Sequence, residues 1–510
     1  MSSVSSADSE NTPPGPDSRF RLESMDLGLR RKIRHLTDRT ARTAIAIGGI
    51  AVIVTILLIF LYLIYEIVPL FRTAQVELAA EYSLPQASAS TLHLAIEEQS
   101  EIGLRLGDDG MLVFFRVADA AEILSQPIIM PTGTSIASFG LESEESGIFA
   151  LGLDNGDVVM AQYEFETRFE PPDNRRVIVP SVSYPYGQEP ITLFADQPVG
   201  AVAIRTRGDS MLLTGVAADG SLALVRGEQQ TGLFSAFDFA DSGSMDLQFI
   251  EVDLLAPNTR QLFFEGDARW LYLLSSGGLL RMLDIQAAQR GALSDFSFET
   301  YLNENRQQPS QVAMLLGGIS LLATDSSGET GQWVITRSEE GSDLARIRSF
   351  PGNEESITAL TTEQRRKNFI TGDASGRVSF YNTTASRTAF SEQLIDDEVS
   401  QLAVSPRGDA LLIESASGEL SLWHVENEHP EVSWAALWNQ VWYEGYSEPE
   451  YIWQSSGATN EFEPKYSLMP LSFGTLKAAF YAMLLAAPLA ICGAIFTGYF
   501  MAPVMRRNVK

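Results

Sequence analysis

Cysteine and histidine, on which metal sites and many catalytic sites are built, are nearly absent from this sequence. Its 510 residues include a single cysteine, Cys492, and four histidines. One cysteine excludes an internal disulfide framework and a cysteine-based zinc site. The sequence also has no glycine-rich loop followed by lysine, which would cradle a phosphate group, and no nucleophile motif. We therefore expect a protein that is not an enzyme and that carries no cofactor.

Basic residues are also scarce. Lysine and arginine number 36 against 65 aspartates and glutamates, so the net charge is −29. A protein that binds nucleic acid needs clustered Lys and Arg to contact phosphates, so this composition argues against a nucleic-acid partner. Hydrophobic residues make up 45% of the chain, which is enough for a sizeable core.

Charged residues are missing altogether from two long runs. Thr43–Tyr65 and Ala478–Val504 contain no charged side chain, and a helix needs about 20 apolar residues to cross the hydrocarbon core of a bilayer. The first run is too long for a cleaved signal peptide, and membrane helices tolerate a proline such as Pro488 in the second. We predict transmembrane helices over residues 43–66 and 468–505, rather than a buried core helix of a soluble domain.

Basic residues gather beside both apolar runs, which predicts the orientation. The positive-inside rule places both flanks in the cytoplasm: a basic tail over residues 1–42, predicted to be disordered in its first twenty residues, and a short end over residues 506–510. Everything between the helices is then extracytoplasmic, which means periplasmic in a bacterial inner membrane. The flanking basic residues are Arg30, Arg31, Lys32, Arg34, Arg39 and Arg42 before the first run and Arg506, Arg507 and Lys510 after the second.

A strand–turn–strand pattern recurs between the two apolar runs. Its clearest copy is LLIESASGELSLWHV, over Leu411–Val425. Alternating apolar residues are typical of half-buried strands, and tight hairpin turns favour glycine because they demand a positive φ. The spacing is close to the repeat of about 40–50 residues of a propeller blade, with room for inserted loops. The seven copies are centred on Gly110, Gly156, Gly220, Gly277, Gly328, Gly376 and Gly418.

These repeats predict a membrane-anchored all-β protein, in which a seven-bladed β-propeller over residues 73–430 is inserted between two transmembrane helices. The pattern is WD-repeat-like, with Trp423 in a second strand, although it lacks the regular Gly-His and Trp-Asp signatures. A closed ring hides its strand edges and brings its two ends together, so it can be inserted between adjacent helices. A pair of β-sandwiches is the alternative.

Two polar clusters could be considered as metal sites. His424 and His429 lie near Glu426 and Glu428, but their spacing fits no zinc pattern, and the segment is predicted to be a strand end and a loop. Asp154, Asn155 and Asp157 surround Gly156 without the full ligand spacing of a calcium loop, and a hairpin turn explains them. We predict no metal site at either place.

Aromatic residues concentrate in a connector over residues 431–467. Trp434, Trp438 and Trp442 are four residues apart, as on one helical face, and Trp453 follows. Aromatic rings prefer membrane interfaces because the ring is apolar and its polar edge favours water. We predict that these four tryptophans lie at the membrane interface on a short helix and elbow; packing against the propeller is the alternative.

The second apolar run carries a stripe of small residues. Residues four apart form a row along a helix, and small side chains let helix backbones approach closely. The first run is bulky from Val52 to Tyr65, so it offers little matching surface. We predict that the stripe packs against helices of partner subunits. It comprises Ala478, Ala482, Ala486, Ala490, Ala494, Gly498 and Ala502.

The C-terminal residues resemble a known family. The stretches Leu437–Ser456 and Phe462–Pro503 are similar to the long form of the phosphate ABC transporter permease subunit of the PstC type, which has a large periplasmic insertion between its first two transmembrane helices. Gly474-Thr475-Leu476 and Ala487-Pro488-Leu489 resemble the opening helix of the conserved permease domain. The close match covers roughly the last 75 residues.

The resemblance implies the N-terminal part of a permease subunit for ATP-driven import of inorganic phosphate. In the family, further helices, the coupling loop and the phosphate-translocating residues follow the position of Lys510. The implied partners are a second permease subunit, a cytoplasmic ATPase dimer, a periplasmic phosphate-binding protein and membrane lipid, with the propeller as an accessory docking or regulatory domain. A membrane-anchored propeller that serves as a scaffold or sensor of the cell envelope is the alternative.

Overall fold

The computed structural model describes most of the chain, in two compact units that divide between Arg72 and Thr73. The described residues are 18–83, 89–208, 210–229, 245–292, 295–302, 308–338, 341–352, 355–457, 462–502 and 505. The first seventeen residues and the basic residues Arg506, Arg507 and Lys510 lie outside them, so the predictions of a disordered tail and a basic C-terminal flank are not addressed.

The first unit is a long helix. Helix α1 spans Ser18–Ile67 and continues into a short 3₁₀ turn at Val68–Phe71. Its segment His35–Phe71 is long and apolar enough to cross a membrane. Asp38 and Glu66, near its two ends, are the acidic residues in that segment.

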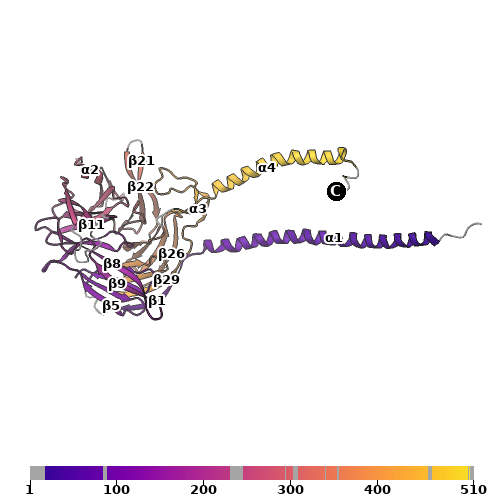
Figure 1. Ribbon diagram of the computed structural model, residues 1–510. Helices are drawn as coiled ribbons and strands as arrows, with labels where there is room; N and C mark the ends of the chain where they lie inside the picture. The colour runs from indigo at the N-terminus through magenta and orange to yellow at the C-terminus, as the bar shows by residue number, and fades with distance from the viewer. Residues whose placement is uncertain are drawn as a thin grey trace, which may run out of the picture. The chain divides into compact units, whose positions relative to one another are not determined.

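The second unit contains a seven-bladed β-propeller, as the repeats predicted, so the alternative of two β-sandwiches was wrong (Figure 1). Each blade is an antiparallel sheet of four strands, and blade 2 has a fifth. The first strands of neighbouring blades contact one another, as β11 does with β6 and β15, and therefore line the centre of the ring.

The strands of the first four blades follow one another along the chain. Blade 1 has β2–β5 at Thr91–Ile96, Ile102–Gly107, Met111–Arg116 and Glu122–Pro127. Blade 2 has β6–β10 at Ile136–Leu141, Ile148–Leu153, Asp157–Glu170, Arg175–Ser183 and Ile191–Thr192. Blade 3 has β11–β14 at Val199–Arg207, Ser210–Ala217, Leu222–Gln229 and Met245–Ile250, and blade 4 has β15–β18 at Thr259–Phe264, Trp270–Ser275, Leu279–Asp284 and Phe298–Tyr301, with helix α2 at Ile285–Gln289.

The remaining blades complete the ring. Blade 5 has β19–β22 at Val312–Met314, Ser320–Thr324, Thr330–Ser338 and Gly341–Phe350. Blade 6 has β23–β26 at Ile357–Thr362, Asn368–Asp373, Arg377–Asn382 and Arg387–Gln393. Blade 7 has β27–β29 at Val399–Val404, Ala410–Ser415 and Glu419–Glu426, with β1 at Gln75–Ser83 as its fourth strand.

The ring is closed by a strand from the opposite end of the propeller sequence. Strand β1 pairs antiparallel with β29 from Gln75↔Glu426 to Ser83↔Glu419 and forms the outer strand of blade 7. Val76, Ala80 and Tyr82 pack against buried residues of blades 6, 7 and 1. The chain therefore enters and leaves the ring at two residues that face each other.

Packing between blades explains why the strands are so apolar. The second strands β3, β7, β16, β20, β24 and β28 are buried along their whole length, because both faces of a blade pack on neighbouring blades. Each is followed by the predicted glycine turn. Six of the seven predicted glycines have positive φ; in blade 4 the residue with positive φ is Gly278 rather than Gly277, because the turn is shifted by one residue.

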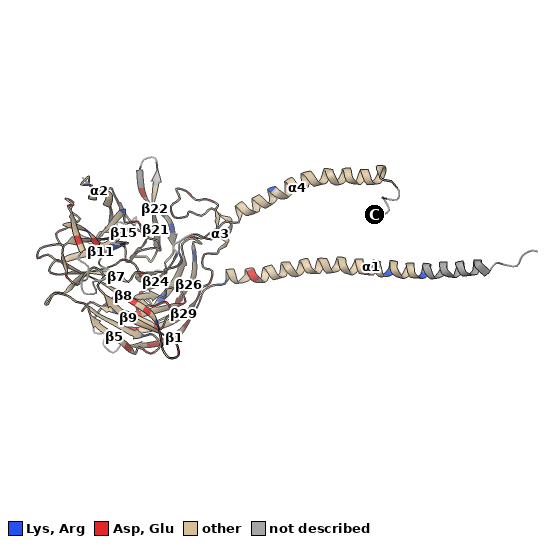
Figure 2. Cartoon of the chain, viewed as in Figure 1, with Lys and Arg blue, Asp and Glu red and all other residues tan. Residues whose placement is uncertain are grey.

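The chain ends in a second long helix. Helix α4 spans Met469–Ile495 and runs through Pro488 into a π-helical turn at Phe496–Phe500. The segment Met469–Phe500 is also long and apolar enough to cross a membrane, and Lys477 is its one charged residue (Figure 2). Both predicted transmembrane segments are thus helices of suitable length and composition.

Candidate functional site: a buried polar network between the propeller and the connector

One face of the ring carries both connections to the apolar helices. We call it the linker face; it is formed by the loops between the first and second strands and between the third and fourth strands of each blade. Examples of such loops are Glu97–Glu101, Leu315–Ile319 and Glu363–Lys367. The paired residues Gln75 and Glu426 lie at the same side, since β29 ends there and β1 begins there.

The connector, residues 431–467, packs on the linker face at blades 5 and 6. Its short helix α3, Trp434–Trp438, begins where the Ser433 hydroxyl accepts a hydrogen bond from the Ala436 amide and donates one to the Ala385 carbonyl. Tyr443 is buried in a cluster with Ala385 and Ala436. The alternative of packing against the propeller therefore holds for this part of the connector.

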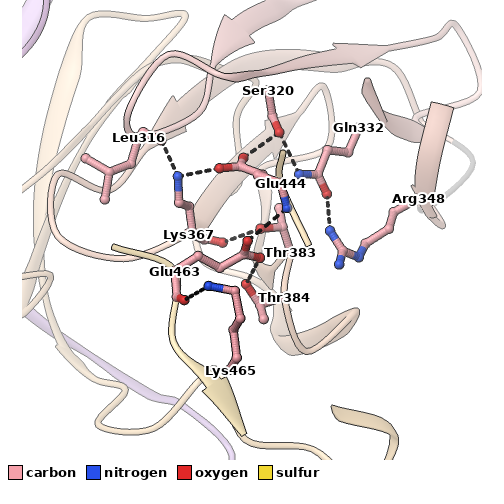
Figure 3. A network of polar contacts seen from close by, with 10 residues as sticks. All are labelled: Leu316, Ser320, Gln332, Arg348, Lys367, Thr383, Thr384, Glu444, Glu463 and Lys465. Carbon is pink, nitrogen blue, oxygen red and sulfur yellow. Dashed lines mark hydrogen bonds and ion pairs between the residues drawn. The ribbon is translucent and has the colours of Figure 1, made fainter. Parts of the chain in front are cut away.

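A buried ion pair forms the centre of the contact (Figure 3). The Lys367 ammonium of blade 6 and the Glu444 carboxylate of the connector are 2.6 Å apart, and their side chains are only 3% and 4% exposed. Lys367 also donates to the Leu316 carbonyl at 2.5 Å, and Glu444 accepts from the Ser320 hydroxyl of blade 5. Both charges are thus paired and hydrogen-bonded, as burial requires.

The network extends into blade 5 through a chain of side chains (Figure 3). Gln332 donates to the Ser320 hydroxyl at 2.9 Å and accepts from the Arg348 guanidinium at 2.8 Å. Arg348 donates in turn to the Trp442 carbonyl of the connector. Burial lowers the pKa of Arg348, and the Glu463 and Glu444 carboxylates oppose that effect.

A second connector carboxylate completes the network on the blade 6 side. Glu463 accepts from the Thr384 hydroxyl at 2.6 Å and from the Glu444 amide at 3.0 Å (Figure 3). Burial raises the pKa of Glu463, and the charge of Glu444 raises it further. Lys465 donates to the Glu463 carbonyl at 3.3 Å and lies over the Phe462 ring, with Nζ 4.9 Å from its centroid.

The arrangement holds two parts of the chain together, because its polar side chains contact one another across the boundary between the propeller and the connector. Because the connector leads directly into α4, the network fixes the start of that helix to blades 5 and 6. The sequence analysis missed Lys367, Glu444 and Glu463. The available signal was weak, because Glu444 and Glu463 are two of six glutamates in the connector, which also carries one lysine, Lys465.

The four tryptophans predicted at a membrane interface have different environments. Trp434, Trp438 and Trp453 are exposed. Trp442 does not share their helical face, because α3 ends at Trp438 and the backbone is extended at Asn439. Its indole donates to the Tyr446 carbonyl at 2.9 Å. Placement at a membrane interface stays a prediction for these residues.

The predicted packing stripe lies on the exposed helix α4 and on the π-helical turn that follows it, and its role in packing stays a prediction. Its residues are Ala482, Ala486, Ala490, Ala494 and Gly498.

The two polar clusters weighed as metal sites have local roles. Asn155 bonds to Asp157 within the turn before β8, at 2.6 Å and 3.1 Å. His424 lies on β29 and pairs with Glu77 in register, whereas His429 lies 3.6 Å from Glu431. Among the residues that the structure describes, no three His, Cys, Asp or Glu side chains are grouped as a metal site.

Glu363, in the same blade 6 loop as Lys367, should give the propeller a pH-dependent stability. Burial raises the pKa of this carboxyl to about 7, against the opposing effects of Asn368 and Arg366, and the connector's Glu431 raises it further. Between the ordinary carboxyl pKa of 4.5 and the raised pKa of about 7, the folded chain therefore keeps a proton on Glu363 that the unfolded chain releases. Because the folded chain binds more protons there, stability falls as pH rises through this interval.

We expect Glu363→Gln to remove this dependence. From about pH 5 to pH 8, the unfolding free energy of the variant should rise relative to that of the wild type by on the order of 3 kcal/mol. Urea unfolding at the two pH values measures this difference. Glu77→Gln, at an exposed position of β1, is the control and should follow the wild type. Parallel pH profiles for all three proteins would contradict the assignment.

Comparison with known proteins adds little to this description. No family model matches the sequence, and no curated protein matches it. Among solved structures, the β-propeller domain of Myceliophteria thermophila Cps50 (Swd1) is 8% identical with a TM-score of 0.45, covering 69% of this chain and 100% of that one. A chain of the Mitotic Checkpoint Complex is 12% identical with a TM-score of 0.44, covering 70% and 94%. The propeller assignment rests on the strand pairing itself.

Proposed function

We propose that the chain is a membrane-anchored docking subunit, in which the propeller is held on two apolar helices and fixed to the second of them by the buried network. The observation that carries this proposal is the Lys367–Glu444 ion pair, which ties blade 6 to the connector immediately before α4. A flexible tether would not need a buried ion pair, whose desolvation is costly. The network is therefore suited to coupling the position of the propeller to that of α4.

The more specific proposal is that this membrane assembly imports inorganic phosphate. The resemblance of Leu437–Ser456 and Phe462–Pro503 to the long-form permease subunit supports it. In this proposal α4 packs its small residues against permease helices, and ATP is hydrolysed by a separate subunit. A scaffold or sensor of the cell envelope, for which the propeller and its anchor would also serve, is the second candidate.

Uptake of labelled phosphate at micromolar concentration tests the specific proposal. A strain that lacks the gene should lose high-affinity uptake, and the wild-type gene should restore it. Ala490→Leu and Ala494→Leu should restore it poorly, because each adds bulk at a close helix contact. Ile56→Val, on the bulky part of α1, is the control and should restore it fully. Unchanged uptake in the deletion strain would leave the scaffold as the function.

The predicted topology can be tested with single cysteines in a Cys492→Ser background. Ala416→Cys lies in the exposed turn between β28 and β29, and Ser5→Cys lies in the N-terminal tail. A membrane-impermeant thiol reagent applied to sealed spheroplasts should label Ala416→Cys and leave Ser5→Cys unlabelled until the cells are lysed. Labelling of Ser5→Cys in intact spheroplasts would refute a cytoplasmic N-terminus.

A further inference from the structure

Blade 2 carries a hairpin, formed by β8 and β9, that extends well past its own sheet. Strand β8 pairs with β7 only from Gly152↔Val158 to Ile148↔Gln162. Beyond Gln162 it continues to Glu170, paired on its other side with β9 as far as Glu170↔Arg175. Between Phe165 and Phe169, therefore, the edge of β8 that faced β7 has no strand beside it among the described residues.

The free edge presents backbone donors and acceptors. The Tyr163 amide donates across this edge to the Gly147 carbonyl at 3.1 Å. Backbone groups point to alternate sides along a strand, so those of Phe165, Thr167 and Phe169 point the same way as those of Tyr163. In the part of the chain that the structure describes, no strand pairs with these groups, and an edge of this kind is a template for a further strand.

The free edge borders a cavity of about 580 Å³ at the linker face. Residues Glu164–Thr167 form one wall, and the loops of blades 1, 2, 6 and 7, including Gln99 and Arg365, form the others. The volume lies within the range of about 300–1,000 Å³ that is usual for binding sites. An ion pair between Arg176 and Glu101 links the hairpin to blade 1.

The cavity is strongly acidic. Among the described residues that line it, Arg365 is the one basic residue, and its side chain is paired with Glu98 at 2.7 Å. Glu145 and Glu164 are exposed and have no ion pair among the described residues. A ligand with positive charge is therefore favoured at this wall. The acidic lining residues are Glu97, Glu98, Glu144, Glu145, Glu164 and Glu166.

We propose that this cavity binds an extended, basic polypeptide segment of a partner, which adds as a strand to the free edge of β8. Main-chain hydrogen bonds to Phe165, Thr167 and Phe169 supply affinity, and alternate side chains supply specificity. Since Glu164 and Glu166 lie on one face of β8 and Phe165 on the other, the segment carries Lys or Arg at every second position with apolar residues between. This site is separate from the buried network and independent of phosphate transport.

The probe is a fluorescent hexapeptide of alternating lysine and valine, titrated against the full chain in nanodiscs and followed by anisotropy. Thr167→Pro removes one edge donor and fills the edge, so it should weaken binding at least tenfold; Thr167→Val keeps the donor and should change binding less than twofold. The double variant Glu145→Gln/Glu164→Gln should also weaken binding at least tenfold. Glu170→Gln, at the hairpin tip outside the cavity, is the matched control.

Two further ligands separate strand addition from simple charge attraction. A hexapeptide of the same charge with every backbone amide N-methylated cannot donate to the ladder from either of its edges, and it should bind at least tenfold more weakly even if Thr167→Pro fails to fold. Spermidine should compete only weakly. Equal binding of the methylated peptide, full competition by spermidine, or no binding of the unmodified peptide would each overturn the proposal.

Discussion

Replacing Lys367 with methionine should lower the free energy of unfolding by about 3–5 kcal/mol, because it leaves the Glu444 carboxylate buried without its partner. Glu444 is only 4% exposed, so water cannot replace the ammonium group. The single variant should also release the connector. Hydrogen exchange at the Glu444 amide, which donates to Glu463, should become faster.

The double variant Lys367→Met/Glu444→Leu removes both charges and should recover much of the lost stability. Arg116→Met is the control, since the Arg116–Asp119 pair is exposed at 56% and 55% and should contribute less than about 1 kcal/mol. Urea unfolding of the detergent-solubilised chain, followed in the β-sheet band of circular dichroism, measures all three. A loss for Lys367→Met no larger than that for Arg116→Met would show that the ion pair does not hold the connector.

A fragment of residues 73–467 should fold as a soluble monomer, whereas a fragment of residues 84–467 should aggregate. The longer fragment retains β1, which closes blade 7 along its full length. The shorter one exposes the edge of β29 and the apolar contacts of Val76 and Tyr82. An exposed apolar strand edge pairs readily with other chains.

A fragment of residues 80–430 should also fail to fold. That fragment cuts β1 and removes the connector, so Lys367 loses Glu444. Size-exclusion chromatography and circular dichroism distinguish the cases, and a synthetic peptide of residues 73–83 added in trans should improve the solubility of the 84–467 fragment. A stable monomer of residues 84–467 would refute the importance of ring closure.

Local signals made the blades predictable from the sequence. The turn between the second and third strands needs a residue with positive φ, and the residues of the flanking strands either alternate between apolar and polar or are all apolar. Each copy can therefore be recognised from about fifteen consecutive residues. Gly278 in place of Gly277 shows the limit of that signal, because two adjacent glycines can occupy the turn equally well.

Long-range pairing could not be predicted in the same way. The partners β1 and β29 are separated by the whole propeller, and nothing in Gln75–Ser83 distinguishes a closing strand from any other. The connector was ambiguous for a different reason. Aromatic residues suit both a membrane interface and a protein core, and only the structure shows Tyr443 buried while Trp434 is exposed.

The pairing of Gln75 with Glu426 determines how the ring responds to force. A pull that separates the chain at these two residues acts across the end of the β1–β29 ladder and opens its hydrogen bonds one after another, as a zipper opens, instead of loading all of them in shear. Force that reaches the ring through Gln75 therefore loads this seam in blade 7 directly. Force applied through α4 acts first on the connector and its Lys367–Glu444 contact with blade 6, so the two ends of the domain resist pulling by different means.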